Sequence, residues 1–190
     1  MDSFRHILSF NNATRIQYKC LNFSSDGKFL VALGGLPDFR ITIWNIETGE
    51  VVSSAEGSSN IDSITFDPRD SSQLCSTGSN GHFVFWTLSA GVLRSVEPQL
   101  ISSDLLSLPQ QLSHVWGRSS DLYIGAEDGD ILYFPSIHAA GDIMSNDQIE
   151  GTEPIRAMIV TKYHLITGSE DGILRFYSLD SKEFCRQIEI

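Results

Sequence analysis

Histidine and cysteine are the residue types of this chain that could hold a metal or attack a substrate, and their spacing favours neither. The five histidines are scattered, at His6, His82, His114, His138 and His164. No H-x-x-x-H pair and no G-x-S-x-G segment is present, so neither a zinc site nor a nucleophilic serine is indicated. The three cysteines, Cys20, Cys75 and Cys185, contain no C-x-x-C pair and form an odd count. We therefore expect no enzyme activity, no cofactor, no metal and no disulfide framework.

His114 and the nearby Trp116 form the first candidate site. His114 lies two residues before Trp116 in a predicted strand, which places both side chains on the same face of the sheet. A hydrogen-bonded packing pair between sheets is the expectation, because both side chains combine apolar surface with a polar atom. A partner-binding site is the alternative.

Two acidic turns form the second candidate site. Segments 127–130 and 170–172 read Glu-Asp-Gly-Asp and Glu-Asp-Gly, and aspartate before glycine is typical of a tight turn. The preference of tight turns for aspartate before glycine explains Asp128 and Asp171. The four carboxylates exceed what the turns need, so an acidic surface for a basic partner is the functional interpretation; its residues are Glu127, Asp128, Glu170 and Asp171. The spacing of a calcium-binding EF-hand is absent.

The charge balance narrows the class of partner. With 13 basic and 24 acidic residues the net charge is −11, which opposes binding to nucleic acid or to an anionic membrane surface. The longest apolar run, 29–33, is far shorter than a membrane span, and a charge pair stands where a signal peptide needs an apolar core. We expect a protein of the cytoplasm or cytoskeleton whose partners are other proteins.

The candidate residues described above lie within a pattern of short strands that repeats four times along the sequence. Four segments of alternating apolar residues close on an aromatic side chain, and these aromatics are spaced 42, 48 and 43 residues apart; they are Trp44, Trp86, Phe134 and Tyr177. A period of roughly 40–45 residues with four short strands per unit is typical of β-propeller blades. The sequence therefore predicts an all-β propeller in which the four aromatics are structural anchors between stacked sheets.

The turn residues give the blade boundaries. We expect about seventeen strands, with blades at about 18–56, 57–97, 112–148 and 153–190 and a long loop at 97–111. Asn80-Gly81 is a strong hairpin signal, and the small pairs that begin at Gly78, Gly125 and Gly168 indicate close packing of neighbouring blades. Residues 1–17 are expected to supply a strand that completes a neighbouring blade.

Four blades are at the low end of the ~4–8 that close a ring. Because the fourth blade already has its own outer strand, the prediction is an open half-propeller, or part of a larger seven-bladed ring. Its two end blades would expose apolar faces that another chain or further sequence must cover. A closed four-bladed ring is the alternative.

The pattern resembles that of WD-repeat propellers. Trp44 and Trp86 match the tryptophan of that repeat, with Phe134 and Tyr177 as substitutes, although the aspartate that normally follows is replaced. Segments 23–30, 36–39, 41–44, 64–68, 75–78, 114–116 and 123–125 are similar, in this order, to cilia- and flagella-associated WD-repeat proteins of the axoneme. That resemblance implies a non-enzymatic scaffold of the cilium or flagellum, involved in tethering inner-arm dyneins.

A second class of WD-repeat protein is an alternative to the axonemal scaffold. Substrate receptors or adaptors of ubiquitin ligases share the fold, and they usually carry a W-D-x-R motif. The corresponding segments here begin at Trp44 and Trp86 and contain no arginine. This alternative therefore has less support from the residues than the axonemal scaffold.

Overall fold

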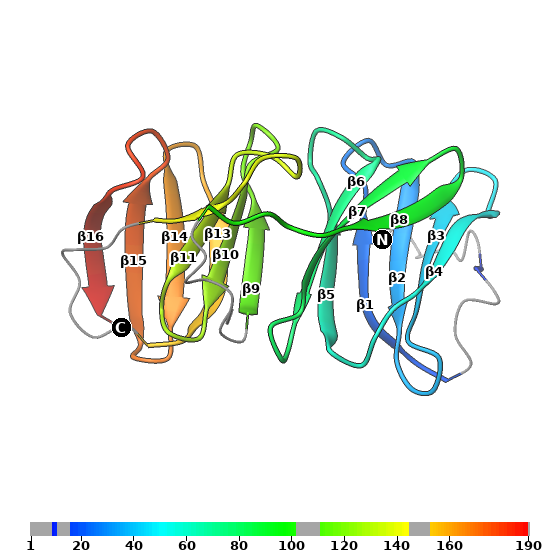
Figure 1. The fold of residues 1–190 in the computed structure, drawn as a ribbon, viewed down its shortest axis with the longest axis horizontal. Helices are drawn as coiled ribbons and strands as arrows, with labels where there is room; N and C mark the ends of the chain where they lie inside the picture. Colours follow the sequence, from blue (N-terminus) through cyan, green and yellow to red (C-terminus); the bar gives the residue numbers. More distant parts are fainter. Residues whose placement is uncertain (1–8, 11–15, 102–110, 145–152, 190) are drawn as a thin grey trace, which may run out of the picture.

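The described part of this protein is built of β-strands (Figure 1). The computed structural model describes residues 9–10, 16–101, 111–144 and 153–189. These ranges contain sixteen strands in four antiparallel four-stranded sheets and no helix, hence none long and apolar enough to cross a membrane. The all-β prediction is confirmed.

Each sheet is one blade, with its strands in chain order. Blade 1 holds β1 (Tyr18–Phe23), β2 (Phe29–Gly34), β3 (Arg40–Asn45) and β4 (Val51–Glu56), and blade 2 holds β5 (Ile61–Phe66), β6 (Gln73–Gly78), β7 (Phe83–Ser89) and β8 (Val92–Val96). Blade 3 holds β9 (Gln111–Trp116), β10 (Leu122–Ala126), β11 (Ile131–Phe134) and β12 (Asp142–Ile143), and blade 4 holds β13 (Ile155–Val160), β14 (His164–Ser169), β15 (Ile173–Ser178) and β16 (Phe184–Glu189).

The blades form an open row. Strand β1 packs along β5, β6 lies beside β9, and β9 packs along β13. Thr65 of β5 also contacts His114 and Trp116 of β9, so each blade meets the next through its first strand. Blades 1 and 4 lie at opposite ends of the row (Figure 1). The predicted open four-bladed propeller is confirmed, and the closed four-bladed ring is not what the chain forms.

The core lies between the blades. One apolar cluster joins blade 1 to blade 2, a second joins blade 2 to blade 3, and a third joins blade 3 to blade 4. Alternation along each strand produces this arrangement, because successive side chains point to opposite faces of the sheet and both faces of an inner blade are covered. Burial between sheets therefore stabilises neighbouring blades together.

The turns follow the predicted chemistry. Gly27 has a φ of +70°, and Asn80 and Gly81 have φ of +54° and +69°, the left-handed pair that a two-residue hairpin turn needs. In the connection after blade 2, Leu100 forms a parallel bridge with Gly141, and β9 already begins at Gln111.

The seventeenth strand, expected over residues 4–10, lies outside the described residues except for its last two positions. Ser9 and Phe10 are described and form no strand. The ring of Phe10 lies 5.5 Å from that of Trp44, so this residue covers the part of the outer face of blade 1 that holds Trp44. The role of residues 1–17 in completing another blade stays a prediction.

Candidate protein-interaction surfaces

The four repeated aromatics occupy equivalent places on their blades. Trp44 is 1% exposed, Trp86 7%, Phe134 0% and Tyr177 1%. Trp86 packs against blade 1, Phe134 against blade 2 and Tyr177 against blade 3, so each faces the blade before its own. Trp44 lies on the face of blade 1 that no described blade covers, and it packs against Leu30, Ala32 and Phe10.

A hydrogen-bond chain surrounds one of the two tryptophans. The Trp86 indole N–H donates to the Ser76 hydroxyl (2.8 Å), which also contacts Nε2 of His82 (3.0 Å). In blade 1 the residue at the position of Ser76 is Ala32, as the strand registers show. The Trp44 indole N–H consequently has no hydrogen-bond partner among the described residues. The hydrogen-bond chain was not predicted from the sequence, although its signal is a serine, Ser76, on the strand that pairs with the strand of Trp86.

His114 and Trp116 link blade 3 to blade 2. The two ring nitrogens of His114 lie 2.6 Å from the hydroxyls of Thr65 and Thr77, and the Trp116 indole N–H donates to Thr65 (3.0 Å). Burial lowers the pKa of His114 to about 4, so the imidazole is neutral at pH 7. Both side chains thus contribute to packing between blades 2 and 3, and the alternative of a partner-binding site stays a prediction.

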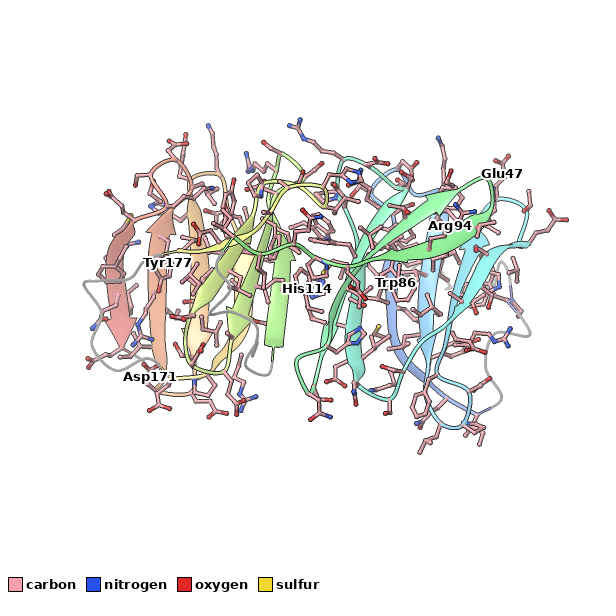
Figure 2. The ribbon with its side chains drawn as sticks, in the orientation of Figure 1. Glu47, Trp86, Arg94, His114, Asp171 and Tyr177 are labelled. Atoms are coloured by element: carbon pink, nitrogen blue, oxygen red, sulfur yellow. The ribbon has the colours of Figure 1, made fainter. Side chains whose placement is uncertain are left out.

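The two acidic turns each connect the second and third strands of a blade, and they lie at the same end of the blades. We call this end the acidic rim. Figure 2 shows Asp171 on this rim and Glu47 on the opposite one. Glu170 accepts a hydrogen bond from Nε of Arg156 (2.6 Å), and Asp171 accepts one from Arg175 (2.6 Å). Two of the four predicted carboxylates are therefore neutralised by arginines of their own blade.

The other two carboxylates remain at the surface. Glu127 and Asp128 are both exposed, and Asp128 accepts the backbone N–H of Asp130, which is turn chemistry. Burial alone would raise the pKa of Asp171, but hydrogen bonds from Arg175 and from the Ile173 backbone lower it overall. Asp171 consequently stays ionised at neutral pH, and the exposed Glu127 and Asp128 carboxylates of this rim lie on blade 3.

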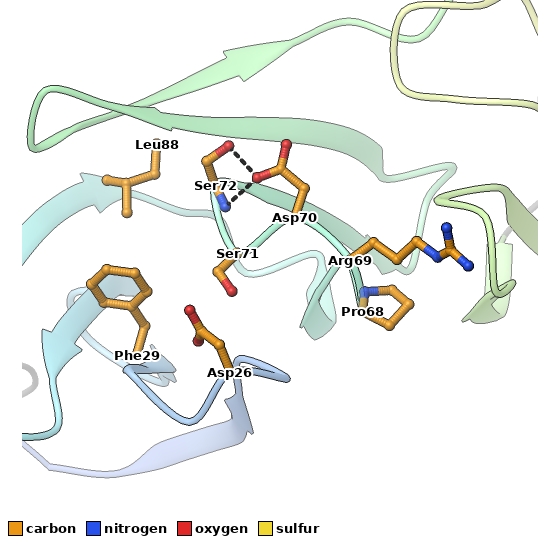
Figure 3. A pocket seen from close by; sticks show the side chains of 8 residues that line it. All are labelled: Asp26, Phe29, Pro68, Arg69, Asp70, Ser71, Ser72 and Leu88. Atoms are coloured by element: carbon orange, nitrogen blue, oxygen red, sulfur yellow. Dashed lines mark hydrogen bonds between the residues drawn. The ribbon is translucent and has the colours of Figure 1, made fainter.

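A groove between blades 1 and 2 lies on the opposite rim (Figure 3). It has a volume of about 390 Å³ and is lined by turns of both blades, with Asp26, Phe29, Ser71 and Leu88 around the hollow while Arg69 extends away. The hydroxyl of Ser24 and the backbone N–H of Lys28 lower the pKa of Asp26. This anionic groove was not predicted, because residues from its two sides are at least 39 positions apart in sequence.

Lys182 joins blade 4 to blade 3 near the same rim. Its ammonium lies 4.3 Å from the ring centre of Tyr133 and 4.9 Å from that of Tyr123, and it donates a hydrogen bond to the Tyr123 hydroxyl. Burial lowers the pKa of Lys182, while the carboxylate of Asp121 at 3.9 Å acts in the opposite direction. The contact holds the two blades together.

Metal ligands do not gather on these surfaces. Within the described ranges, no group of three or more His, Cys, Asp or Glu side chains could hold a metal ion. The three cysteines are free thiols, of which Cys75 is buried. What the arrangement offers is two rims and two end faces, which suit contact with other proteins.

Comparison with known proteins decides the family. Residues 2–190 match the family model described as the CFAP43 N-terminal domain. This chain belongs to that family. The match covers all four blades, so the resemblance to cilia- and flagella-associated WD-repeat proteins is confirmed.

Individual relatives agree with the family assignment. WD repeat-containing protein 90 of Mus musculus is 28% identical over 178 residues, which cover 92% of this chain and 9% of the relative. Cilia- and flagella-associated protein 43 of Chlamydomonas reinhardtii is 30% identical over 126 residues, covering 60% and 7%. The chain therefore spans less than a tenth of the length of either relative.

A solved structure shows the same fold. The β-propeller domain of Myceliophteria thermophila Cps50 (Swd1) superposes with a TM-score of 0.69 at 13% identity. The match covers 85% of this chain and 51% of that one. The four blades thus follow the course of about half of that chain.

Proposed function

We propose that this chain is a non-enzymatic protein-interaction module of the ciliary or flagellar axoneme. The match of residues 2–190 to the CFAP43 N-terminal domain carries the proposal. A fold built only of blades supports it, because such blades present rims and faces to other proteins. The charge of −11 favours protein partners over nucleic acid or anionic lipid.

The finer role that we propose is in dynein tethering and motility. The segments similar to axonemal WD-repeat proteins, among them 23–30, 36–39 and 41–44, are surface turns together with the strands that hold them. A tether needs a rigid body with several contact surfaces, and blades that share apolar cores provide such a body. The chain would act by holding axonemal subunits in place.

On the acidic rim we place the contact with a basic partner segment. Glu127 and Asp128 would carry most of it, because both side chains are exposed at the tip of a turn. Exposed charge of this kind speeds association more than it adds affinity, and salt weakens its effect.

The test is localisation with matched variants. A tagged copy expressed in flagellated cells is expected in the detergent-extracted axoneme, with dynein subunits among proteins labelled by proximity. The variant Glu127→Gln with Asp128→Asn should reduce that labelling severalfold. The control variant Glu47→Gln with Glu50→Gln removes the same charge from the opposite rim and should leave labelling unchanged.

Two results would contradict the proposal at different levels. A tagged chain distributed evenly between axoneme and soluble fractions would refute the axonemal role. Axonemal localisation with labelling that is equal for both charge variants would leave the scaffold role standing and refute the acidic contact.

A further inference from the structure

The outer face of blade 4 is an uncovered apolar sheet face. A shallow groove of about 130 Å³ runs along it, lined mainly by Ala157, Ile159, Ile166, Gly168 and Leu174. Ile159 is 58% exposed. A Cβ added to Gly168 would meet its nearest neighbour, Leu174, at 3.4 Å, whereas one added to Gly125 of blade 3 would meet Ile155 at 2.6 Å. The close approach found at inner blades is missing here because no described residue packs a further blade on this face.

The outer face of blade 1 is the second face that no other blade covers among the described residues. Leu21 and Phe23 on β1 are 58% and 62% exposed. Farther out, Phe10 covers part of Trp44. The Trp44 indole N–H and the Thr42 hydroxyl are buried on this face without a hydrogen-bond partner among the described residues. Buried polar atoms of this kind usually find partners in a complete structure.

Strand register shows which inner face each end face matches. Four side chains of blade 1 point to blade 2: Asn22, Val31, Ile41 and Ile43. The strand pairings place four apolar residues of blade 4 at the same positions, in the same order: Ile159, Ile166, Leu174 and Phe176. Val31, Ile41 and Ile43 are fully buried against blade 2. The outer face of blade 4 is therefore built to pack against a following blade.

The converse holds for blade 1. Its outward positions Phe23, Leu30 and Trp44 correspond to Val160, Leu165 and Tyr177, which pack blade 4 against blade 3. The outer face of blade 1 is thus built to follow another blade. The chain carries both halves of the interface that it forms three times internally.

We propose that a second copy of the chain occupies these faces, head to tail, so that two arcs close an eight-bladed ring. Each copy supplies the half-interface that the other lacks, and the two contacts are related by a two-fold axis. The arc matches 51% of the propeller chain that it superposes on, so two arcs have about the extent of one ring. Eight blades lie within the ~4–8 found in closed propellers.

The repeat also specifies a contact. Within the chain, Asn22 accepts the backbone N–H of Phe66 (3.0 Å), and Thr65 accepts the indole N–H of Trp116 (3.0 Å). In both contacts, the next-to-last residue of the first strand of one blade meets the last residue of the first strand of the next blade. The same rule places Ile159 of one copy on Phe23 of the other, which buries two apolar side chains that are now exposed.

Mass measurement in solution tests the ring. The 190-residue chain is expected to run as a dimer by light scattering after size-exclusion chromatography, twice the mass of one chain. Phe23→Asp and Ile159→Asp should each halve that mass, because either change places a carboxylate in both contacts. Tyr163→Asp is the matched control: Tyr163 is 62% exposed, lies in a turn off the end faces, and should leave the dimer intact.

Mixing the two variants separates this arrangement from others. An equimolar mixture of Phe23→Asp and Ile159→Asp chains restores one unaltered contact, so a dimer should reappear. A monomeric wild-type chain, a mass that neither substitution changes, a mixture that stays monomeric, or oligomers that lengthen with concentration would each overturn the proposal. Circular dichroism checks that the variants fold. The proposal does not rest on the axonemal role, and localisation can fail independently of it.

Discussion

Buried tryptophans at equivalent positions differ here in one hydrogen bond. Trp86 donates to Ser76, whereas Trp44 faces Ala32 and donates to no described residue. A buried donor without a partner costs about 1–3 kcal/mol, so the same substitution should have different effects at the two sites.

Trp44→Ala and Trp86→Ala are each expected to lower the free energy of unfolding by about 3–5 kcal/mol, because each removes a large buried side chain. Trp86 lies between blades 1 and 2, and Trp44 lies between blade 1 and Phe10. Trp86→Phe should cost about 1 kcal/mol more than Trp44→Phe, since only the first change removes a hydrogen bond. Urea unfolding of the four variants measures this. Equal costs for the two phenylalanine variants would show that the chain through Ser76 contributes nothing.

His114 predicts how stability depends on pH. Its pKa is about 4 in the folded chain and about 6.5 when unfolded, so the unfolded state binds the proton first as the pH falls. The contribution is fully present above pH 6.5 and is lost between about pH 6.5 and 4, by up to about 3 kcal/mol. Burial also lowers the pKa of His82, which acts in the same direction.

Stability curves of the wild type and of His114→Gln between pH 7 and 4 test this expectation. The variant should be less stable at pH 7 and show a flatter decline toward pH 4. His138→Gln, at an exposed position, is the control and should follow the wild-type slope. A wild-type slope in the His114 variant would contradict the assignment.

At the scale of elements, the distance between a strand and its neighbours decides where a side chain fits. A Cβ on Gly78 would lie 1.8 Å from the carbonyl oxygen of Asn60, which is backbone and cannot move aside easily. A Cβ on Gly168 meets only Leu174 at 3.4 Å and Ala157 at 3.9 Å. The three small pairs are similar in sequence, but the end blade leaves the last of them open.

Gly78→Ala is therefore expected to lower the unfolding free energy by about 2 kcal/mol or more, because the backbone must shift. Gly168→Ala should change it by less than about 1 kcal/mol, since alanine has the better strand entropy and space is available. Thermal melts of both variants measure the difference. Similar losses would mean that blade 4 is packed as closely as blade 2.

The whole molecule has two kinds of blade, those with two neighbours and those with one. Blades 2 and 3 bury both faces, whereas blades 1 and 4 each leave one face to solvent or to a partner. Local opening requires less free energy where fewer apolar contacts must be broken.

Hydrogen exchange should reveal this order in the Phe23→Asp variant, in which the end faces stay uncovered. We expect the amides of β6 and β7 to exchange slowest and those of β14 and β15 at least tenfold faster, although both pairs are inner strands of their sheets. Uniform protection across the four blades would indicate that the arc unfolds as one unit.

The sequence by itself determined the repeat, the strands, the turn glycines and the family, because these depend on local patterns of side-chain size, polarity and backbone preference. Asn80-Gly81 is an example, since its positive φ values follow from those two residues alone. Part of the candidate site was also visible, since four carboxylates in two turns can be counted along the chain.

Tertiary structure alone decided how those residues are used. Packing of the sheets brings His114 onto Thr65 and Thr77, and side-chain reach within blade 4 pairs Glu170 with Arg156. The groove between blades 1 and 2 and the two uncovered faces likewise depend on how the sheets stack. Local sequence cannot specify such contacts, because the distance between residues far apart in the chain is set by the packing of whole blades.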